Sequence, residues 1–233
     1  MNIFKNKSLR QLVANFRNEY ISHGIDENKL AINPIDQFEI WFQEAVKSKV
    51  PEPNAMHLAT ATINGKPSGR VMLLKGFDES GFIFFSNYES RKGNELDNNP
   101  YASITFLWLE LARQMRIEGT VSRISVVESE TYFQSRPRTS QISACASEQS
   151  RYLHSREELE DRFQKARKYY SDKPIARPAH WGGYCLKPTY LEFWQAVRVV
   201  CTIVYNTVYK TMEFGNGIAC IPNTYTITTA YLE

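Results

Sequence analysis

The feature that most constrains the fold of this sequence is a series of short β-type segments between residues 55 and 124. Apolar and aromatic residues dominate these segments, at residues 55–63, 71–74, 82–85, 101–109 and 114–124. Turn signals separate several of them: Asn64-Gly65 is typical of a tight hairpin, and Asp78 to Gly81 is typical of a turn. Because such short turns join antiparallel neighbours, the sequence predicts an antiparallel meander.

Helical patterns flank this meander on both sides. An amphipathic helix is expected at residues 8–20, and a second begins at Asn33-Pro34, with proline in its first turn. Further elements are expected as helices at 90–97, from 126 through 133 with a continuation at 140–146, and at 157–169, followed by strands at 183–187 and 190–195. This order predicts an α+β fold: one domain over residues 1–233, with a β-barrel or strongly curved sheet, flanking helices and residues 1–20 as an N-terminal arm.

Charge and cysteine usage narrow the class of protein. The chain carries 28 basic and 25 acidic residues, a net charge of +3, which is too balanced for nucleic acid to be its main partner. Its four cysteines are scattered without metal-ligand spacing, which argues against a metal site or a disulfide framework and favours a cytoplasmic protein. Neither a signal-peptide pattern nor the ~18 consecutive apolar residues of a membrane span occur, so no membrane association is expected.

The stretch 69–92 brings four cations close together in sequence. Arg70 and Lys75 bracket one apolar segment, and Arg91 and Lys92 occupy the first turn of a helix that Ser90 can cap. A helix N-terminus offers N–H groups and a positive dipole end, so it suits a phosphate. The residues alone leave a hairpin with solvated charges as the alternative.

A second cationic group lies between Tyr132 and Ser140. Tyr132, Arg136 and Ser140 are spaced four residues apart, which on a helix would place them on one face, although Pro137 interrupts the run. A phenol, a guanidinium and a hydroxyl that converge would form a phosphate clamp, and a helix-capping cluster is the alternative. Two phosphate-sized sites indicate a phosphorylated cofactor and a phosphorylated substrate.

Other polar and aromatic residues could line a planar ligand. Gln114 could donate to a ring carbonyl, and Gln149, Ser150 and Trp194 could face the ring, although an ordinary strand residue and a core tryptophan are the alternatives. No Ser-His-Asp, HExxH, phosphate-loop or dinucleotide pattern is present. We therefore predict no catalytic side-chain nucleophile or base and no metal ligand.

Seven short motifs occur along the chain, in the order RVMLLK, SNYESRKGNELDNNP, ARQMRIEG, YFQSRPRTSQI, SEQS, WGGY and LEFWQ. Each is weak alone, but together, over about residues 20–195, they closely resemble the pyridoxamine 5′-phosphate oxidase family. The resemblance implies an FMN-binding split β-barrel that works as a homodimer, with FMN at the subunit interface. It also implies oxidation of pyridoxamine or pyridoxine 5′-phosphate to pyridoxal 5′-phosphate, with O2 as the acceptor.

The resemblance assigns roles to individual residues. The family's FMN contacts fall on Arg70, Val71, Lys75, Phe85, Ser86, Arg91, Lys92, Gln114, Gln149, Ser150 and Trp194. Its contacts to the substrate phosphate fall on Lys75, Tyr132, Arg136 and Ser140. Flavin N5 takes the hydride in this family, which agrees with the missing nucleophile motifs.

The sequence departs from the family after Gln195. The family continues with Arg-Leu-His-Asp-Arg, whereas the corresponding residues here are Val200, Cys201, Thr202, Ile203 and Val204. The codons for Cys-Thr-Ile-Val, read from their third bases, allow His-Asp-Arg. The same frame carried forward permits Trp at position 215, Arg-Leu-Tyr-Pro at positions 219–222 and then a stop codon.

These joint matches lead to the hypothesis that one base is lost near codon 196, which leaves residues 196–233 out of frame. A genuinely divergent tail is the alternative, and the strand-like character of residues 202–208 would then be real. The tail also leaves a second function open: a flavin- or pyridoxal-phosphate-binding protein with little or no oxidase activity.

Overall fold

The computed structural model describes residues 11, 24–196, 202–214 and 217–230, and for the last two ranges the backbone alone. The expected helix at 8–20 lies outside the described residues, apart from residue 11. The strands are β1 (Ala55–Ala61), β2 (Pro67–Leu73), β3 (Gly76–Asp78), β4 (Gly81–Asn87), β5 (Tyr101–Trp108), β6 (Arg113–Arg123), β7 (Trp181–Gln195), β8 (Thr202–Phe214) and β9 (Gly217–Ala230). The helices are η1 (Glu27–Lys29), α2 (Pro34–Lys47), α3 (Arg91–Asn98), η2 (Leu109–Leu111), α4 (Val126–Ser135), α5 (Arg138–Ala146) and α6 (Arg156–Tyr169).

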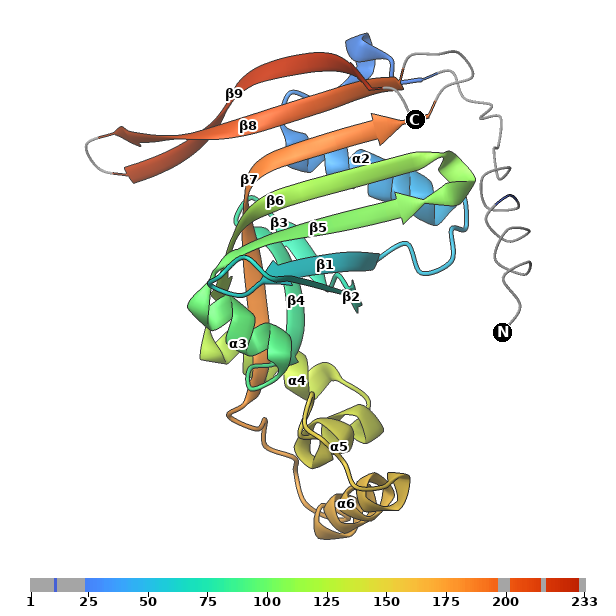
Figure 1. Ribbon diagram of the computed structural model, residues 1–233, viewed down its shortest axis with the longest axis vertical. Coiled ribbons are helices and arrows are strands. Elements are labelled where there is room, and N and C mark those ends of the chain that lie inside the picture. The colour runs from blue at the N-terminus through green and yellow to red at the C-terminus, as the bar shows by residue number, and fades with distance from the viewer. Residues whose placement is uncertain (1–10, 12–23, 197–201, 215–216, 231–233) are drawn as a thin grey trace.

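The strands form one antiparallel sheet that branches at β7 (Figure 1). β6 pairs along most of one edge of β7. On the other edge of β7, β4 pairs with residues 181–186 and β8 pairs with residues 190–195. The separate strands expected at 183–187 and 190–195 are therefore one strand, and that prediction was wrong. The register slips at Thr189, opposite Glu118 and Gly119, and this β-bulge lets both halves stay paired with β6.

The connection between β2 and β3 forces the sheet to curl. The two strands stand at opposite ends of the order β2-β1-β5-β6-β7-β4-β3, yet only Leu74 and Lys75 separate them in the chain. Three Cα steps span at most about 11 Å, whereas six strand spacings in a flat sheet would span roughly 29 Å. The link is bonded to both sides: the Leu74 N–H donates to Asn54 O and the Lys75 N–H donates to Ile83 O, each at 2.8 Å. The expected α+β class with a strongly curved antiparallel sheet is confirmed.

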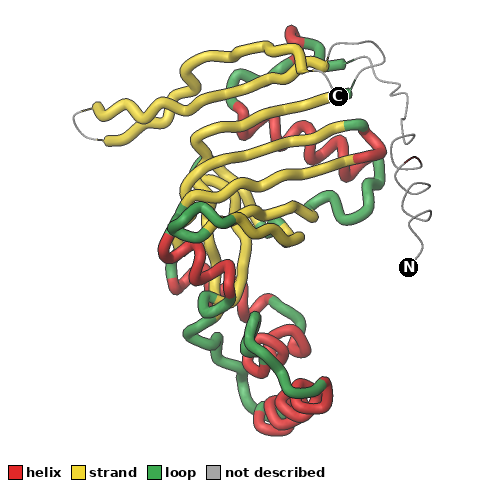
Figure 2. The backbone as a smooth tube through the Cα atoms, viewed as in Figure 1, coloured by secondary structure: helices red, strands yellow, loops and turns green. Residues whose placement is uncertain are grey.

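Helix α2 fills the concave side of the curled sheet (Figure 2). Asn33 caps it by accepting from the Ile35 N–H at 2.8 Å, and Pro34 occupies its first turn, as expected. Phe38 has no exposed surface. Its ring centroid lies 4.8, 5.0 and 5.3 Å from those of Phe77 on β3, Phe82 on β4 and Phe106 on β5. One aromatic side chain thus contacts three strands and joins the two sides of the curl.

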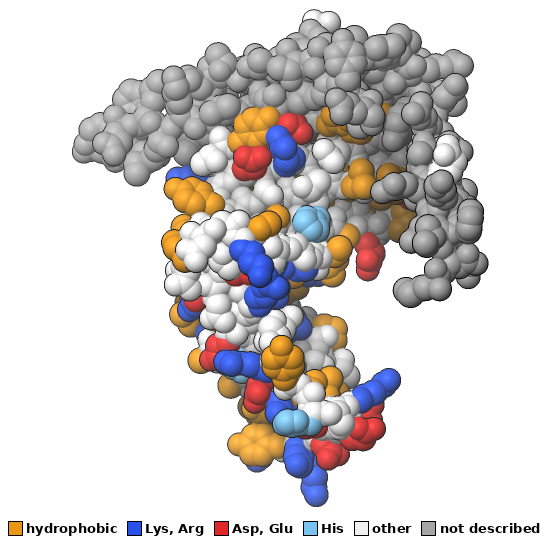
Figure 3. Space-filling view, in the orientation of Figure 1, with side chains coloured by type: hydrophobic (Ala, Val, Ile, Leu, Met, Phe, Trp, Pro, Cys, Tyr) orange, Lys and Arg blue, Asp and Glu red, His pale blue; other side chains and the backbone are white. Residues whose placement is uncertain are grey.

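Helices α4, α5 and α6 form a second part below the sheet, with a small apolar cluster of their own. The helix expected from 126 through 146 is broken, because Arg136 adopts an extended conformation ahead of Pro137. No α6 side chain is buried, and side chains of both charge signs cover this end of the molecule (Figure 3). Among the described helices, none has the length and apolar character needed to cross a bilayer.

Replacing Phe38 with alanine should lower the free energy of unfolding by about 3–5 kcal/mol, because it removes a fully buried ring and leaves a cavity. Urea denaturation measures this change. The matched control is Ile40→Ala on the same helix, where the side chain is 41% exposed and the loss should stay below about 1 kcal/mol. Equal losses in the two variants would contradict the role given to Phe38.

Candidate functional site

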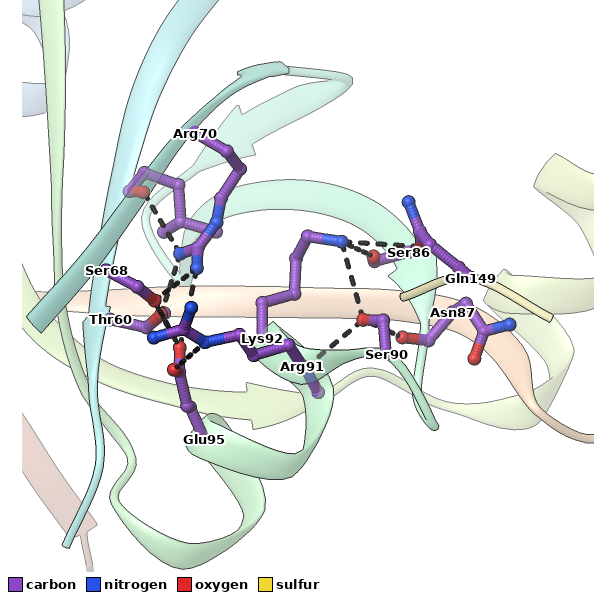
Figure 4. Close-up of polar contacts among 12 residues, drawn as sticks. Thr60, Ser68, Arg70, Ser86, Asn87, Ser90, Arg91, Lys92, Glu95 and Gln149 are labelled. Atoms are coloured by element: carbon purple, nitrogen blue, oxygen red, sulfur yellow. Dashed lines mark hydrogen bonds and ion pairs between the residues drawn. The ribbon is translucent and has the colours of Figure 1, made fainter. Parts of the chain in front are cut away.

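Three cations gather at the N-terminus of α3, and we call Arg70, Arg91 and Lys92 the cation cluster (Figure 4). Ser90 caps the helix by accepting from the Gly93 N–H, as the sequence predicted. Arg91 and Lys92 form the first turn, where helix N–H groups lack partners within the helix. Arg70 reaches the same region from β2, since the curl brings that edge strand next to α3.

The Lys92 side chain is buried, with 6% of its surface exposed. Its Nζ donates to Ser86 Oγ at 3.0 Å, to Gln149 Oε1 at 3.3 Å and to Ser90 Oγ at 3.4 Å. All three partners are neutral, so among the described residues the ammonium has hydrogen bonds but no counter-charge in contact. Burial, and then the nearby charge of Arg70, lower the pKa of Lys92 to about 8. Such a group gains stability when an anion binds.

The two arginines of the cation cluster are held by one buried carboxylate, that of Glu95. Glu95 accepts from Arg91 Nε at 2.9 Å and lies 3.4 Å from Arg70 Nη2. The hydroxyls of Thr60 and Ser68 donate to the same oxygen, Oε2, at 2.5 and 2.6 Å. Burial alone would raise the pKa of Glu95, but the hydrogen bonds from Ser68, Thr60 and Arg91 outweigh it and lower the pKa to about 2.

The cation cluster therefore carries three positive charges against the one negative charge of Glu95. The excess of two charges matches the charge of a phosphate monoester above its second ionisation. Arg91 and Glu95 also line a cavity of about 520 Å³ that reaches Ser150 and Arg151. The arrangement is chemically suited to holding a phosphate at the α3 N-terminus.

The second predicted site lies on the other side of β4. The rings of Phe85, Tyr132 and Trp181 are nearly parallel, with centroids 3.8 Å apart for Phe85 and Tyr132 and 5.5 Å apart for Phe85 and Trp181. The guanidinium carbon of Arg136 lies 4.4 Å from the Trp181 ring centroid. We call Phe85, Tyr132, Trp181 and Arg136 the aromatic cluster.

Arg136 reaches this position from an extended segment, and not from the helical face that the sequence suggested. It is not on the helical face of Tyr132, because α4 ends at Ser135 and Arg136 is extended. Its Nη1 atom is buried and has no hydrogen-bond acceptor among the described residues. Burial lowers the pKa of Arg136, and burial raises the pKa of the Tyr132 phenol. An anion accepting from the guanidinium would offset the cost of its burial.

Strand β4 connects the two clusters. Ser86 contacts Lys92, whereas its neighbour Phe85 stacks on Tyr132, because successive residues of a strand point to opposite faces. Of the remaining predicted residues, Lys75 is exposed beside this strand, and Ser140 lies half-buried in the first turn of α5. Gln149 contacts Lys92, and Ser150 follows it with a positive φ of 69°.

Three predicted residues lie on the face of the sheet opposite α2, which we call the outer face, away from the cation cluster. Val71 is 71% exposed, and its cross-strand row continues through His57 and Thr105 to Arg116 on β6. Gln114 and Trp194 form a cross-strand pair on that same face. Three strand spacings, about 14 Å, separate β2 from β6. The chain thus places Gln114 and Trp194 on the opposite side of the sheet from its own Arg70.

Sequence reasoning did not identify several residues that hold the two clusters in place. Glu95, Thr60 and Ser68 fix the arginines, and Trp181 supports Arg136. The spacing of Arg91 and Glu95, four residues apart on one helix, was a local signal for an ion pair. Nothing local marked Thr60 or Ser68, since their contacts with Glu95 depend on the pairing of β1 with β2.

The lowered pKa of Lys92 predicts a pH-dependent affinity for a phosphate monoester, for which a fluorescent flavin phosphate is a suitable probe. The ammonium is present below about pH 8 and lost above it, while a bound dianion favours the charged form. The affinity should therefore fall as the pH rises through 8, by at most about tenfold per pH unit, as fluorescence titration would measure. Lys92→Arg keeps its charge and should give a flat profile from pH 7 to 9, and a flat wild-type profile would contradict the prediction.

Comparisons with known proteins agree with this geometry. A family model described as pyridoxamine 5′-phosphate oxidase matches residues 42–170, more than half of the chain. The pyridoxine/pyridoxamine 5′-phosphate oxidase of Paraburkholderia phytofirmans is 51% identical over 183 residues, which cover 78% of this chain and 85% of that protein. The enzyme of the same name from Janthinobacterium sp. is 49% identical over 196 residues, with 83% and 92% covered.

Solved structures support the same fold. PhzG from Burkholderia lata 383, crystallised with tetrahydrophenazine-1-carboxylic acid, is 27% identical with a TM-score of 0.78, over 91% of this chain and 99% of PhzG. A pyridoxamine 5′-phosphate oxidase-related, FMN-binding protein from Nostoc punctiforme shares the fold at 14% identity and a TM-score of 0.63, over 87% of this chain and all of that protein. This chain therefore belongs to the pyridoxamine 5′-phosphate oxidase family of oxidoreductases and has its split-barrel fold.

Proposed function

We propose that this protein binds FMN and oxidises pyridoxamine 5′-phosphate or pyridoxine 5′-phosphate to pyridoxal 5′-phosphate, with O2 as the electron acceptor. The observation that supports this function best is the pair of anion sites that share β4. One site is built on Lys92 and the other on Arg136 and Tyr132. Ser86 contacts Lys92, and its neighbour Phe85 stacks on Tyr132. Two phosphates, one on the cofactor and one on the substrate, fit this arrangement.

The cation cluster is the proposed FMN phosphate site. Lys92 is buried among neutral partners, so a phosphate dianion would supply its missing counter-charge. Arg91 is the most exposed of the three cations and would complete the contact from the helix start. Bound FMN supplies the two-electron acceptor of the reaction, so no nucleophilic side chain is required.

The aromatic cluster is the proposed site of the substrate phosphate. The buried Nη1 of Arg136 offers a donor with no acceptor among the described residues. Tyr132 stands beside it, and Ser140 and Lys75 are the further contacts that family membership suggests. These residues would orient the substrate over the flavin, and orientation of this kind accounts for large factors in rate.

We also propose that the FMN site is completed by a second copy of the chain. Gln114 and Trp194 lie on the outer face of the sheet, whereas Arg70 points to the opposite side of β2. Side chains on opposite faces of one sheet cannot line one pocket, whereas a second chain that covers the edge strand β2 could present its own Gln114 and Trp194 beside Arg70. Val71, Tyr101 and Leu107 are largely exposed there, as expected of an unfilled interface. The expected cytoplasmic location remains a prediction.

The FMN site is tested by the variant Arg91→Ala/Lys92→Ala. Loss of two charge-assisted phosphate contacts should weaken FMN binding by on the order of 10²-fold or more, measured by flavin fluorescence titration. Arg167→Ala/Lys168→Ala removes the same residue pair from the exposed face of α6 and should leave the affinity unchanged. The flavin-loaded wild type should sediment as a dimer. An FMN affinity unaffected by the first variant would rule out this site.

We further propose that residues 196–233 are out of frame. As written, positions 200, 202 and 204 carry Val200, Thr202 and Val204 where the family has Arg, His and Arg. The backbone of β8 pairs with the end of β7, from Gln195 opposite Ile203 to Tyr190 opposite Val208. Main-chain pairing of this kind does not require the family's side chains, so it is compatible with either origin of the tail.

A single inserted base at codon 196 should restore Arg-Leu-His-Asp-Arg, the early stop codon and the oxidase activity. The chain as written lacks two groups that would orient the substrate, and misplacement by about 1 Å can cost on the order of 10²-fold in rate. We expect it to be slower than the restored chain by several powers of ten. The measurement is pyridoxal 5′-phosphate formation from pyridoxamine 5′-phosphate, with both proteins loaded with FMN. Equal rates would show that the written tail supports the chemistry.

The same comparison decides the second candidate function. If the chain as written binds FMN and pyridoxal 5′-phosphate but does not turn over, it is a binding protein of this fold. The observation that favours this candidate is the loss of Arg and His at positions 200 and 202, since both proposed anion sites precede residue 196.

A further inference from the structure

We propose that Trp181 is a positioning residue for the substrate phosphate: its indole holds the guanidinium of Arg136 in place without neutralising it. The inference deepens the proposed function, because it rests on Arg136 as the phosphate contact. Trp181 was part of a family-like motif in the sequence but had no assigned role. Its place at the start of β7, beside Phe85 and Tyr132, gives it one.

The two anion sites hold their arginines in different ways. Arg70 and Arg91 are fixed by the Glu95 carboxylate, which also cancels part of their charge. Arg136 instead lies over the Trp181 ring at 4.4 Å, with the Phe133 ring farther away at 5.9 Å. An aromatic face attracts a guanidinium and restrains its plane, but accepts none of its in-plane hydrogen bonds. The N–H donors of Arg136 thus stay available for an anion.

The fold fixes Trp181 itself from several sides. It is only 8% exposed and packs edge-on against Phe133 at 5.4 Å. Its backbone oxygen accepts from the Arg177 guanidinium, and its backbone N–H donates to Pro178 O at 3.0 Å. The next residue is Gly182, where a Cβ would lie 2.1 Å from the Tyr88 hydroxyl, so a larger residue there would force the Tyr88 side chain to shift. The indole therefore has little freedom to move away from Arg136.

The buried guanidinium of Arg136 would be stabilised by an anion that accepts its hydrogen bond. Nη1 lacks an acceptor among the described residues, which is costly for a buried donor. The Tyr132 ring is nearly parallel to Trp181, at an angle of 6° and a centroid distance of 6.3 Å. Tyr132 and Arg136 are thus both ordered by the same indole. A phosphate that accepts from Arg136 would meet a guanidinium that is already oriented, which reduces the entropy lost on binding.

The test compares pyridoxal 5′-phosphate with pyridoxal, which lacks the phosphate, as ligands of the FMN-loaded protein. Trp181→Leu keeps an apolar side chain but removes the aromatic face, so it should weaken pyridoxal 5′-phosphate binding about 3- to 30-fold. Pyridoxal affinity should change less than twofold. Trp181→Phe retains a ring and should stay within about threefold of wild type for both ligands.

A matched control separates positioning from packing. Phe163 on α6 packs against the same apolar cluster as Trp181, so Phe163→Leu should lower the melting temperature without changing the ratio of the two affinities. A Trp181→Leu protein with an unchanged ratio, or with equal losses for both ligands, would overturn the proposal. If wild type itself binds the two ligands equally, the phosphate site of the proposed function fails, and this inference fails with it.

A double-mutant cycle with a less disruptive substitution covers the case in which Trp181→Leu does not fold. Trp181→Met, a longer apolar side chain that also lacks the aromatic face, and Arg136→Lys are measured alone and together with the same two ligands. Coupled side chains predict that the loss of phosphate selectivity in the double variant is smaller than the product of the single losses. Losses that multiply would mean that the two residues act independently, and would overturn the proposal.

Discussion

The two-residue link between β2 and β3 is the constraint on which the rest of this structure depends. Leu74 and Lys75 join strands at opposite ends of the seven-strand order, so the sheet has to curl until its edges approach. The curl creates the concave face that α2 fills with Phe38. It also brings Arg70 on one edge strand to Glu95 on α3. The core and the candidate phosphate site are therefore consequences of one connection.

Electrostatics then distinguishes the two proposed anion sites. The two arginines at α3 share one carboxylate, that of Glu95, whose low pKa keeps it ionised across the physiological range. Lys92, by contrast, has only neutral contacts in the described part of the chain, and Arg136 lies against an indole in place of a carboxylate. A site that satisfied every cation internally would have little reason to bind a phosphate. Incomplete compensation costs stability in the empty protein and favours the bound state.

The outer face of the sheet carries predicted ligand-binding residues among exposed apolar side chains. Val71, Gln114 and Trp194 lie there, on the opposite side of the sheet from Arg70. A row of exposed apolar side chains accompanies them, including Leu107 at 57% exposure. Both features are explained together if a second chain covers this face and if each flavin contacts both chains. The solved relatives share the fold, and a shared fold does not determine activity, which depends on the side chains that line a site.

The sequence alone determined the elements and the chemistry. Local patterns predicted α2 with its start at Asn33-Pro34, α3 with its Ser90 cap and most of the strands, because caps, turns and apolar periodicity act over a few residues. The same local reasoning identified Arg91 and Lys92 at a helix start. It failed where long-range pairing outweighed a local signal: the strands predicted separately at 183–187 and 190–195 are one strand, because the pairing with β6 resumes beyond Thr189.

Only the tertiary structure decided which of these groups meet. The strand order, the burial of Lys92, the four donors on Glu95 and the indole beneath Arg136 all join residues far apart in the chain. Their positions depend on how the sheet closes, and one sequence pattern is compatible with many strand orders. The charges were visible in the sequence. Whether each charge is solvated, paired or buried without a counter-ion depends on the contacts that folding makes, and that difference determines whether it binds a ligand.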